Sequence, residues 1–395
     1  MEKISLEQIR LFRLWAHRLD REYGREEALA AAGACGLQNS PPGAWETALH
    51  CRVPSLSLTE MQGLLYRERS LLQAWSLRGA PVVFPTGESG AFLAALVPQG
   101  EEPWAYTKGI GLALDALGLS FGFLLALLQE TIPRLEGREI VSKTALDQTL
   151  AEWMTPRIPP DKRPIWTSPS PYGMPDKQTM GGAAVSFLLR PCSFLGLVVF
   201  GERAGASPSF TAYQSWVGRP LAPSREDGKN LARKFLHCYG PAAPGDFAEW
   251  LGCSGAQARR LWACLEEEAA PVDVGGKRRF LLAADRDRLL CPEPPRRELL
   301  LLGGHDPYLD QRDREVLLPN KARQRQVWKT TANPGAVVYR GEIAGIWTSR
   351  KKRDGAELSI TLWREIPGKE RLAQLAEEYA FFRGLRLLRA DTAEA

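Results

Sequence analysis

Three groups of basic and carboxamide side chains have the residue types and spacing that contacts with a nucleic acid require. Arginine can pair with guanine and glutamine with adenine through two hydrogen bonds, and arginine and lysine bind phosphates. The first group recurs at intervals of 3, 4 and 4 residues, which places it on one stripe of a helix: Arg10, Arg13, His17 and Arg21. The second group lies between residues 254 and 278: Ser254, Gln257, Arg260, Lys277 and Arg278. The third is a continuous basic run: Arg350, Lys351, Lys352 and Arg353.

Each group also has a structural interpretation. A basic run is commonly the solvated tip of a hairpin, and a polar stripe on a helix only requires that the opposite face be buried. A helix-turn-helix unit can also serve as a scaffold between proteins. From the residues alone, these alternatives stay open.

Patterns for metal, nucleotide and nucleophile chemistry are missing from the sequence. The four histidines are scattered, at 17, 50, 237 and 305, and none has a second histidine or a cysteine three or four residues away. There is no glycine-rich phosphate loop and no Gly-x-Ser-x-Gly elbow. Asp306 and Asp310 are close enough for acid chemistry, although a carboxylate pair in a loop is more commonly a turn. We therefore expect neither a metal nor a cofactor.

The second basic group belongs to the segment with the clearest local pattern, residues 229–284. Helices are predicted over Asn230–Cys238, over Asp246–Leu251 and from Ser254 to about residue 268, followed by a hairpin with Gly275-Gly276 at its tip. This order is typical of a winged helix-turn-helix, in which the third helix enters the major groove. We expect the start of that helix to reach base edges and the wing to contact phosphates.

The other parts of the chain are predicted with less detail. Ser5 and Ser57 begin capping-box helices, and a hairpin over 71–84 completes a winged-helix outline. Strands at Ala336–Tyr339, Ile343–Ser349 and Glu357–Trp363, with a final helix over 368–382, predict a β-rich, barrel-like C-terminal part: a small β-barrel or a curled sheet with one helix packed against it. The expected fold class is α+β, with tandem winged-helix units in a C-shaped arrangement. The expected parts are 1–110 and 111–220 as winged-helix-like units, 221–295 as the winged helix-turn-helix, and 296–395 as the β-rich domain.

Composition and charge agree with a globular chain that binds a polyanion. Of 395 residues, 44% are hydrophobic and 25% are charged, which excludes disordered, collagen-like and coiled-coil proteins. The net charge of +5 lies in residues 296–395, which hold 19 Lys and Arg against 14 Asp and Glu. Neither a membrane span nor a cleavable signal is expected. The odd number of cysteines, seven without a Cys-x-x-Cys pair, predicts a reduced cytoplasmic protein.

Several segments, taken in order, resemble the AlkZ/YcaQ-type winged-helix DNA glycosylases. The most specific match is the stretch from Tyr239-Gly240-Pro241-Ala242 through Asp246 to Gly252. The other matching segments are Arg10–Leu19, Gly36–Gln38, Ala48–Arg52, His305–Leu309, Arg312–Arg314 and Gly341–Trp347. The resemblance implies tandem winged-helix units in a C shape, a β-rich C-terminal part, a positively charged channel for duplex DNA, and no cofactor.

The activity implied by the resemblance is hydrolysis of the N-glycosidic bond of alkylated or crosslinked purines. An N7-alkylated purine is a good leaving group, so the site mainly stabilises an oxocarbenium-like sugar and aims a water. The family places two polar acceptors on one turn, as Gln-apolar-Gln or Gln-apolar-Asp. The matching positions here read Gln38, Asn39 and Ser40. Gln38 would orient the water with Asn39 or Ser40 assisting; its structural alternative is a turn or capping side chain.

The leading hypothesis is a DNA-binding protein of this architecture, monomeric and cytoplasmic, that excises a damaged base from duplex DNA. The alternative is a non-catalytic DNA-binding regulator or lesion sensor, because the second acceptor of the turn is replaced by the shorter Ser40. A third interpretation is an interaction scaffold that binds no nucleic acid.

Overall fold

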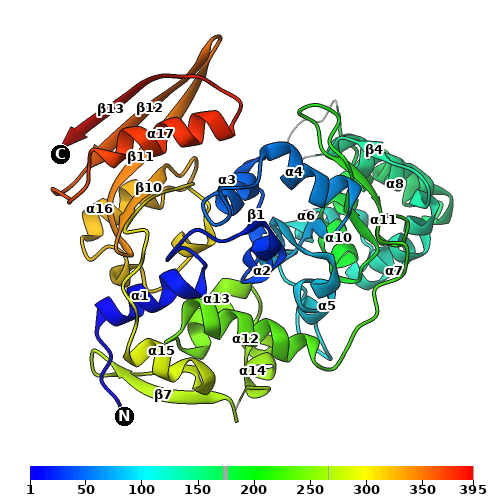
Figure 1. Ribbon diagram of the computed structural model, residues 1–395. Coiled ribbons are helices and arrows are strands. Elements are labelled where there is room, and N and C mark those ends of the chain that lie inside the picture. Colours follow the sequence, from blue (N-terminus) through cyan, green and yellow to red (C-terminus); the bar gives the residue numbers. More distant parts are fainter. Residues whose placement is uncertain (171, 173–176, 266, 395) are drawn as a thin grey trace. The chain divides into compact units, whose positions relative to one another are not determined.

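A computed structural model describes residues 1–170, 172, 177–265 and 267–394 (Figure 1). Helices and strands are mixed along the chain, which confirms the α+β class. The chain forms two compact units: residues 1–63, 232–250 and 261–395 make unit 1, and residues 64–231 and 251–260 make unit 2. The expected boundaries at 110, 220 and 295 do not coincide with this division. The four-part division and the C shape stay predictions.

Helix α1 (Leu6–Ala16) is the centre of one of the cores of unit 1. The expected capping box at its start is confirmed, because the Ser5 hydroxyl accepts from the Gln8 amide and the Gln8 side chain accepts from the Ser5 amide. Its apolar residues Ile9 and Phe12 pack with Leu281 of the basic hairpin. The following helices of unit 1 are α2 (Ala28–Gly33), α3 (Ala44–His50) and α4 (Leu58–Gln62), and the capping box at Ser57 is also confirmed.

The element order predicted for residues 229–284 is confirmed. The helices are α12 (Asp227–Tyr239), α13 (Pro244–Leu251) and α14 (Gly255–Ala263), and the hairpin strands are β7 (Ala269–Val274) and β8 (Lys277–Leu282). The third helix ends at Ala263, earlier than expected. Both outer edges of the hairpin carry backbone hydrogen bonds: β7 bonds to the N-terminal segment through Asp273 and Ile4, and β8 bonds to Ala242 through Phe280. These bonds anchor both strands of the hairpin, and its tip from Gly275 to Arg278 is exposed.

The C-terminal part of unit 1 is an open sheet with one helix packed against it, the second of the two expected forms, and not a barrel. Its five strands follow the order β13-β12-β11-β10-β9, so β13 and β9 are free edges instead of pairing with each other. The three predicted strands appear as β10 (Gly335–Tyr339), β11 (Glu342–Lys352) and β12 (Gly355–Leu362). Two further strands, β9 (Leu299–Leu302) and β13 (Leu387–Glu394), were not predicted.

Helix α17 (Arg371–Phe382) covers one face of this sheet (Figure 1). Its buried residues Leu372, Leu375 and Ala376 pack with Leu358 and Ile360 of β12. The connection through α17 returns the chain beside β12, which makes β13 parallel to β12. Two short helices complete this unit, α15 (Arg286–Leu290) and α16 (Lys321–Val327).

Unit 2 consists mainly of helices around one large apolar cluster. The predicted hairpin is confirmed as β2 (Leu71–Trp75) and β3 (Pro81–Pro85), which are antiparallel. A small second sheet has the order β4-β6-β5, and its strands span Ile140–Val141, Ser209–Ala212 and Val198–Phe200. The helices are α5 (Ser89–Phe92), α6 (Gly111–Leu117), α7 (Phe121–Thr131), α8 (Lys143–Met154), α9 (Arg163–Trp166), α10 (Met180–Phe194) and α11 (Tyr213–Val217).

The described residues include no single helix that is long and apolar enough to cross a membrane. One helix pair, Gly111–Leu117 with Phe121–Leu135, meets the length and composition only when taken together, and it is bent by 95°.

Candidate active site

The turn between α2 and α3 carries the three residues that the resemblance singles out. After β1 (Leu37–Gln38), the chain passes through Asn39 and Ser40, and a cis peptide joins Ser40 to Pro41. The Asn39 side-chain oxygen Oδ1 accepts the Gly43 amide at 2.7 Å, and Gly43 has a φ of +90°, a conformation that favours glycine. This bond fixes the turn just before α3 begins. Asn39 is 5% exposed and its Oδ1 holds the turn, and its expected role of assisting a water stays a prediction.

Gln38 is held in one orientation by two hydrogen bonds of its amide nitrogen. Nε2 donates to the Ser40 carbonyl oxygen at 3.1 Å and lies 3.2 Å from Nδ1 of His305, which accepts when its proton is on Nε2. Both amide hydrogens are then used within the protein. Among the described residues, no protein group donates to the Gln38 side-chain oxygen Oε1. That oxygen is the acceptor which the turn leaves available. The Ser40 side chain is exposed.

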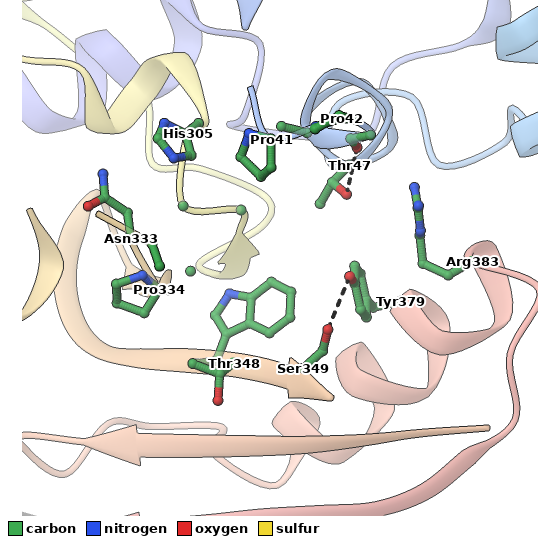
Figure 2. Close-up of a pocket in the computed structure, with 17 residues that line it drawn as sticks. Pro41, Pro42, Thr47, His305, Asn333, Pro334, Thr348, Ser349, Tyr379 and Arg383 are labelled. Atoms are coloured by element: carbon green, nitrogen blue, oxygen red, sulfur yellow. Dashed lines mark hydrogen bonds between the residues drawn. The ribbon is translucent and has the colours of Figure 1, made fainter. Parts of the chain in front are cut away.

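A cavity of about 400 Å³ opens beside this turn, within unit 1 (Figure 2). Its walls come from four parts of the chain that are far apart in the sequence: the Gln38 turn with α3, the loop after β9, the start of β10 with β11, and α17. The lining residues are Pro41–Ala44, Thr47, Gly303–His305, Ala332–Gly335, Trp347–Ser349, Tyr379 and Arg383. His305 is therefore shared between the cavity wall and Gln38.

The cavity walls combine two aromatic rings with fixed polar groups. The Trp347 indole donates to the Leu302 carbonyl oxygen at 2.8 Å, and its ring meets Tyr379 edge-on with centroids 4.8 Å apart. At the other side, Arg383 donates to the Glu46 carboxylate at 2.7 Å. Figure 2 shows Tyr379 and Arg383 across one space from Pro41. A flat aromatic ligand with polar edges fits such walls.

A buried ion pair fixes the loop that carries His305. The Arg52 guanidinium forms two hydrogen bonds with the Asp306 carboxylate, at 2.8 and 3.0 Å, and both side chains are at most 1% exposed. Arg52 also donates to the carbonyl oxygens of His17 and Ala48. Burial alone lowers the pKa of Arg52, but the charge and the hydrogen bonds of Asp306, together with nearby Cys35 and Cys51, raise this pKa above its ordinary value. His305 is thus held against Gln38 by its neighbour Asp306.

The expected polar stripe does not form on α1: the helix ends at Ala16, so His17 and Arg21 lie beyond it, and two of the four residues are buried. Arg13 is 1% exposed and His17 is fully buried. Arg13 donates to both oxygens of Asp313 and to the carbonyl oxygens of Tyr239 and Gly240. It therefore connects α1 to two distant segments and has no donor to offer a phosphate. Arg10 bonds to the Val316 carbonyl oxygen and lies 3.7 Å from Glu342, whereas Arg21 is exposed.

The start of α14 is also used inside the protein. Ser254 accepts the Gln257 amide as the helix cap, as predicted for its position. Gln257 is 1% exposed and its amide nitrogen donates to the Leu96 carbonyl oxygen at 2.9 Å, so it is turned away from any base edge. Arg260 makes two hydrogen bonds with Glu102, which hold the pKa of that carboxyl below its usual range. The burial of Gln257 contradicts the expectation that it reads bases, whereas the expected base contact of Arg260, which is partly exposed, stays a prediction.

Two other expected basic segments face solvent. Lys277 and Arg278 are exposed at the tip of the β7–β8 hairpin. Arg350, Lys351 and Arg353 are exposed at the far end of β11. The basic run was expected at the tip of a hairpin, but up to Lys352 it belongs to the strand. Lys352 is half-buried and lies 3.2 Å from Glu357 on β12.

Sequence reasoning missed the role of His305. No second histidine or cysteine lies three or four residues away from it, so the sequence indicated only a structural role. The available signal was its place in the segment His305–Leu309, one of those that carry the family resemblance. It also missed the cavity, because Trp347 and Tyr379 meet only after β11 and α17 pack together.

Comparisons with known proteins agree with this architecture. The model of the AlkZ-like DNA glycosylase family matches residues 31–383. The solved structure of the Streptomyces sahachiroi DNA glycosylase AlkZ is similar in fold, with a TM-score of 0.78 at 22% identity, over 99% of this chain and 100% of that chain. A comparison with curated proteins found no match. Since the family model covers most of its length, this chain belongs to the AlkZ-like DNA glycosylase family.

Proposed function

We propose that this protein binds duplex DNA and hydrolyses the N-glycosidic bond of an N7-alkylated or crosslinked purine, with Gln38 positioning the attacking water. The observation that carries the proposal is the hydrogen bonding of Gln38. Its amide nitrogen is engaged by Ser40 and His305, and its Oε1 is left as an acceptor. An oriented carboxamide oxygen holds a water and offers partial negative charge to a developing oxocarbenium sugar.

The chemistry asks little of the protein because the leaving group is already activated. A purine alkylated at N7 carries a positive charge, and it leaves as a neutral base when the bond to C1′ breaks. The water oxygen bonds to C1′, and its proton passes to solvent. A carboxamide does not titrate near neutral pH, so Gln38 acts by orientation and electrostatics and not as a general base.

The cavity beside the turn is the proposed place for the damaged nucleotide. Its volume of about 400 Å³ lies in the range of small-molecule sites, and Trp347 and Tyr379 offer aromatic surface to a base. A cationic purine is attracted to such rings more strongly than a neutral one. This gives a physical reason for preferring alkylated bases over the normal ones.

The test is release of N7-methylguanine from a methylated duplex by the wild type and by Gln38→Ala. We expect the variant to lose at least about tenfold in single-turnover rate, because it removes the group that orients the water. Ser40→Ala is the matched control on the same turn, and its rate should stay within about twofold because the Ser40 side chain is exposed. Equal rates for the wild type and Gln38→Ala would remove Gln38 from the mechanism.

The second candidate is a non-catalytic lesion sensor or regulator. It is favoured by Asn39, whose oxygen is bonded to the Gly43 amide, so that the turn presents one carboxamide acceptor where the family pattern has two polar acceptors. A sensor would bind a methylated duplex more tightly than an unmodified one and release no base. Base release by the wild type that disappears in Gln38→Ala would exclude it.

Contacts with DNA are proposed for the exposed cations alone: Arg21, Lys277, Arg278, Arg350, Lys351 and Arg353. The winged-helix arrangement around the duplex, the cytoplasmic location and the monomeric state stay predictions.

A further inference from the structure

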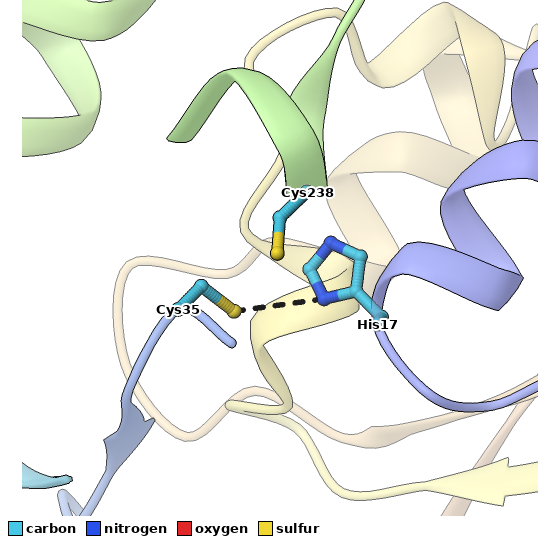
Figure 3. A group of neighbouring side chains, drawn as sticks. All are labelled: His17, Cys35 and Cys238. Carbon is cyan, nitrogen blue, oxygen red and sulfur yellow. Dashed lines mark hydrogen bonds between the residues drawn. The ribbon is translucent and has the colours of Figure 1, made fainter. Parts of the chain in front are cut away.

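Three metal-binding side chains meet inside unit 1, away from the cavity. His17 follows α1, Cys35 lies between α2 and Gln38, and Cys238 is near the end of α12. Their ligand atoms all lie within 4.8 Å of one another (Figure 3). The exposed fractions are 0% for His17, 4% for Cys35 and 0% for Cys238. The sequence pattern excluded a metal because it shows only ligands that are neighbours along the chain, whereas this cluster is assembled by the tertiary fold.

The distances suit a thiophilic metal ion. The Cys35 sulfur lies 3.6 Å from Nδ1 of His17. In a tetrahedral zinc site, with bonds of about 2.3 Å to sulfur and about 2.0–2.1 Å to nitrogen, the ligand atoms are about 3.5–3.8 Å apart, which is compatible with the 4.8 Å that encloses these three. A thiol that donates to the imidazole has a similar separation. A second observation is therefore needed to separate the two.

That observation is the other imidazole nitrogen. Nε2 of His17 is buried and has no hydrogen-bond partner among the described residues. A buried ring nitrogen without a partner costs about 1–3 kcal/mol. Figure 3 shows the ring with both of its nitrogens on the side of the sulfurs, Nδ1 toward Cys35 and Nε2 on the side of Cys238. A thiol hydrogen bond at Nδ1 leaves this cost in place, whereas an ion bound through Nε2 offsets it and leaves Nδ1 facing the Cys35 sulfur.

The surroundings hold the cluster rigidly. The His17 ring is packed edge-on between Tyr239 and Tyr308, at centroid distances of 5.0 and 5.4 Å. Its own carbonyl oxygen accepts from Arg52. Ligands that are fixed in advance lose little entropy when an ion binds. A divalent ion with two thiolates and a neutral imidazole carries no net charge, which a buried site tolerates better than separate thiolates.

We propose that His17, Cys35 and Cys238 bind a thiophilic metal ion of the zinc class, which ties the ends of α1 and α12 to the segment that leads into Gln38. Two sulfurs and one imidazole select zinc or copper(I) over magnesium or calcium, which prefer oxygen ligands. The ion would enter as the chain folds, because the finished site is closed to solvent. This proposal does not depend on the proposed function.

The experiment measures metal content and not activity. The wild type, refolded with zinc and dialysed, should retain about one ion per chain by mass spectrometry. Cobalt(II) in place of zinc should give a thiolate-to-metal charge-transfer band. A separate copper(I) arm, refolded under reducing conditions, identifies which ion of the class binds more tightly. Wild type that retains neither zinc nor copper and shows no cobalt band would overturn the proposal.

Variants assign the site. Cys35→Ser and Cys238→Ala should each lose the ion and the cobalt band, whereas two controls should keep both. Cys192→Ser changes a cysteine that is equally buried but lies elsewhere, and Cys264→Ser changes an exposed one. Loss of metal in Cys264→Ser with retention in Cys238→Ala would overturn the assignment. If Cys35→Ser does not fold, the wild-type measurement and Cys238→Ala still decide.

Discussion

Arg13 and Arg52 are enclosed by unit 1, whereas Arg350 and Arg353 of the same unit stand in solvent at the end of the β11–β12 hairpin. Each enclosed arginine faces a carboxylate, Asp313 or Asp306, and also backbone carbonyl oxygens. Among the residues that the structure describes, the two exposed arginines have no ion-pair partner. The same residue type thus serves as an internal connection in one region and as an available charge in the other.

This difference separates arginines that stabilise the fold from arginines that are available to bind DNA. Arg13 joins α1 to the turn after α12 and to the segment around Asp313, and these are places where the sequence resembles the glycosylase family. Much of that resemblance therefore reflects connections that hold the fold together. The cations proposed to contact a polyanion lie outside those segments, at the two hairpin tips and at Arg21.

The largest expected effect comes from breaking the most enclosed pair. Arg52→Met should lower the free energy of unfolding by about 3–5 kcal/mol, because it leaves the Asp306 carboxylate buried without its partner. Urea unfolding measures the loss. Adding Asp306→Asn to this variant should recover part of the stability, since the uncompensated charge is removed. A loss below about 1 kcal/mol in the single variant would contradict the view of this pair as an internal connection.

The sequence predicts the contrast between buried and exposed arginines for some elements and not for others. Spacing placed Arg13 and His17 on one stripe of α1, but spacing cannot tell whether that stripe faces solvent or another segment. The apolar residues Ile9 and Phe12 cover one side of the helix, and the distant segments 239–241 and 311–313 cover the other. The burial of Arg13 is thus decided by tertiary contacts that local pattern does not contain.

The strands show the same limit. The β7–β8 hairpin and strands β10 to β12 were predicted because alternation and turn residues are local signals. Strand β9 reads Leu-Leu-Leu-Leu and is buried on both faces, so it has no alternation. Strand β13 is polar and pairs in parallel with β12 only after α17 has returned the chain. The cavity and the His17–Cys35–Cys238 cluster are likewise formed by segments that meet only in the folded chain.

His50 extends the comparison between enclosed and exposed basic side chains, because its burial favours the uncharged form. It stacks on Phe382 with ring centroids 3.9 Å apart, and burial together with the Arg297 charge lowers its pKa from 6.5 to about 4. Between these two values the unfolded chain binds a proton that the folded protein does not. Stability should therefore fall as the pH falls, by about 1–2 kcal/mol between about pH 7 and pH 5 for this partly exposed side chain.

Urea unfolding of the wild type and His50→Gln at the two pH values measures this contribution. The variant should show a smaller loss on acidification, although other groups contribute to both proteins. An equal loss in the two proteins would show that His50 is already free to protonate in the folded state.

The smallest effect on stability is expected at the exposed end of the comparison. Replacing Arg350, Lys351 and Arg353 with glutamine should change the free energy of unfolding by no more than about 0.5 kcal/mol, because the side chains lie in solvent.

If these three side chains bind phosphates, the slope of log affinity for a duplex against log salt should become shallower by about 0.9 for each phosphate that is no longer neutralised. Fluorescence anisotropy with a labelled duplex measures the slope. Lys352→Gln is the matched control, since Lys352 already pairs with Glu357 and should change the slope less. A triple variant with an unaltered salt slope would take this hairpin out of the DNA-binding surface, and the same outcome for Lys277→Gln with Arg278→Gln would favour a protein scaffold over a DNA-binding enzyme.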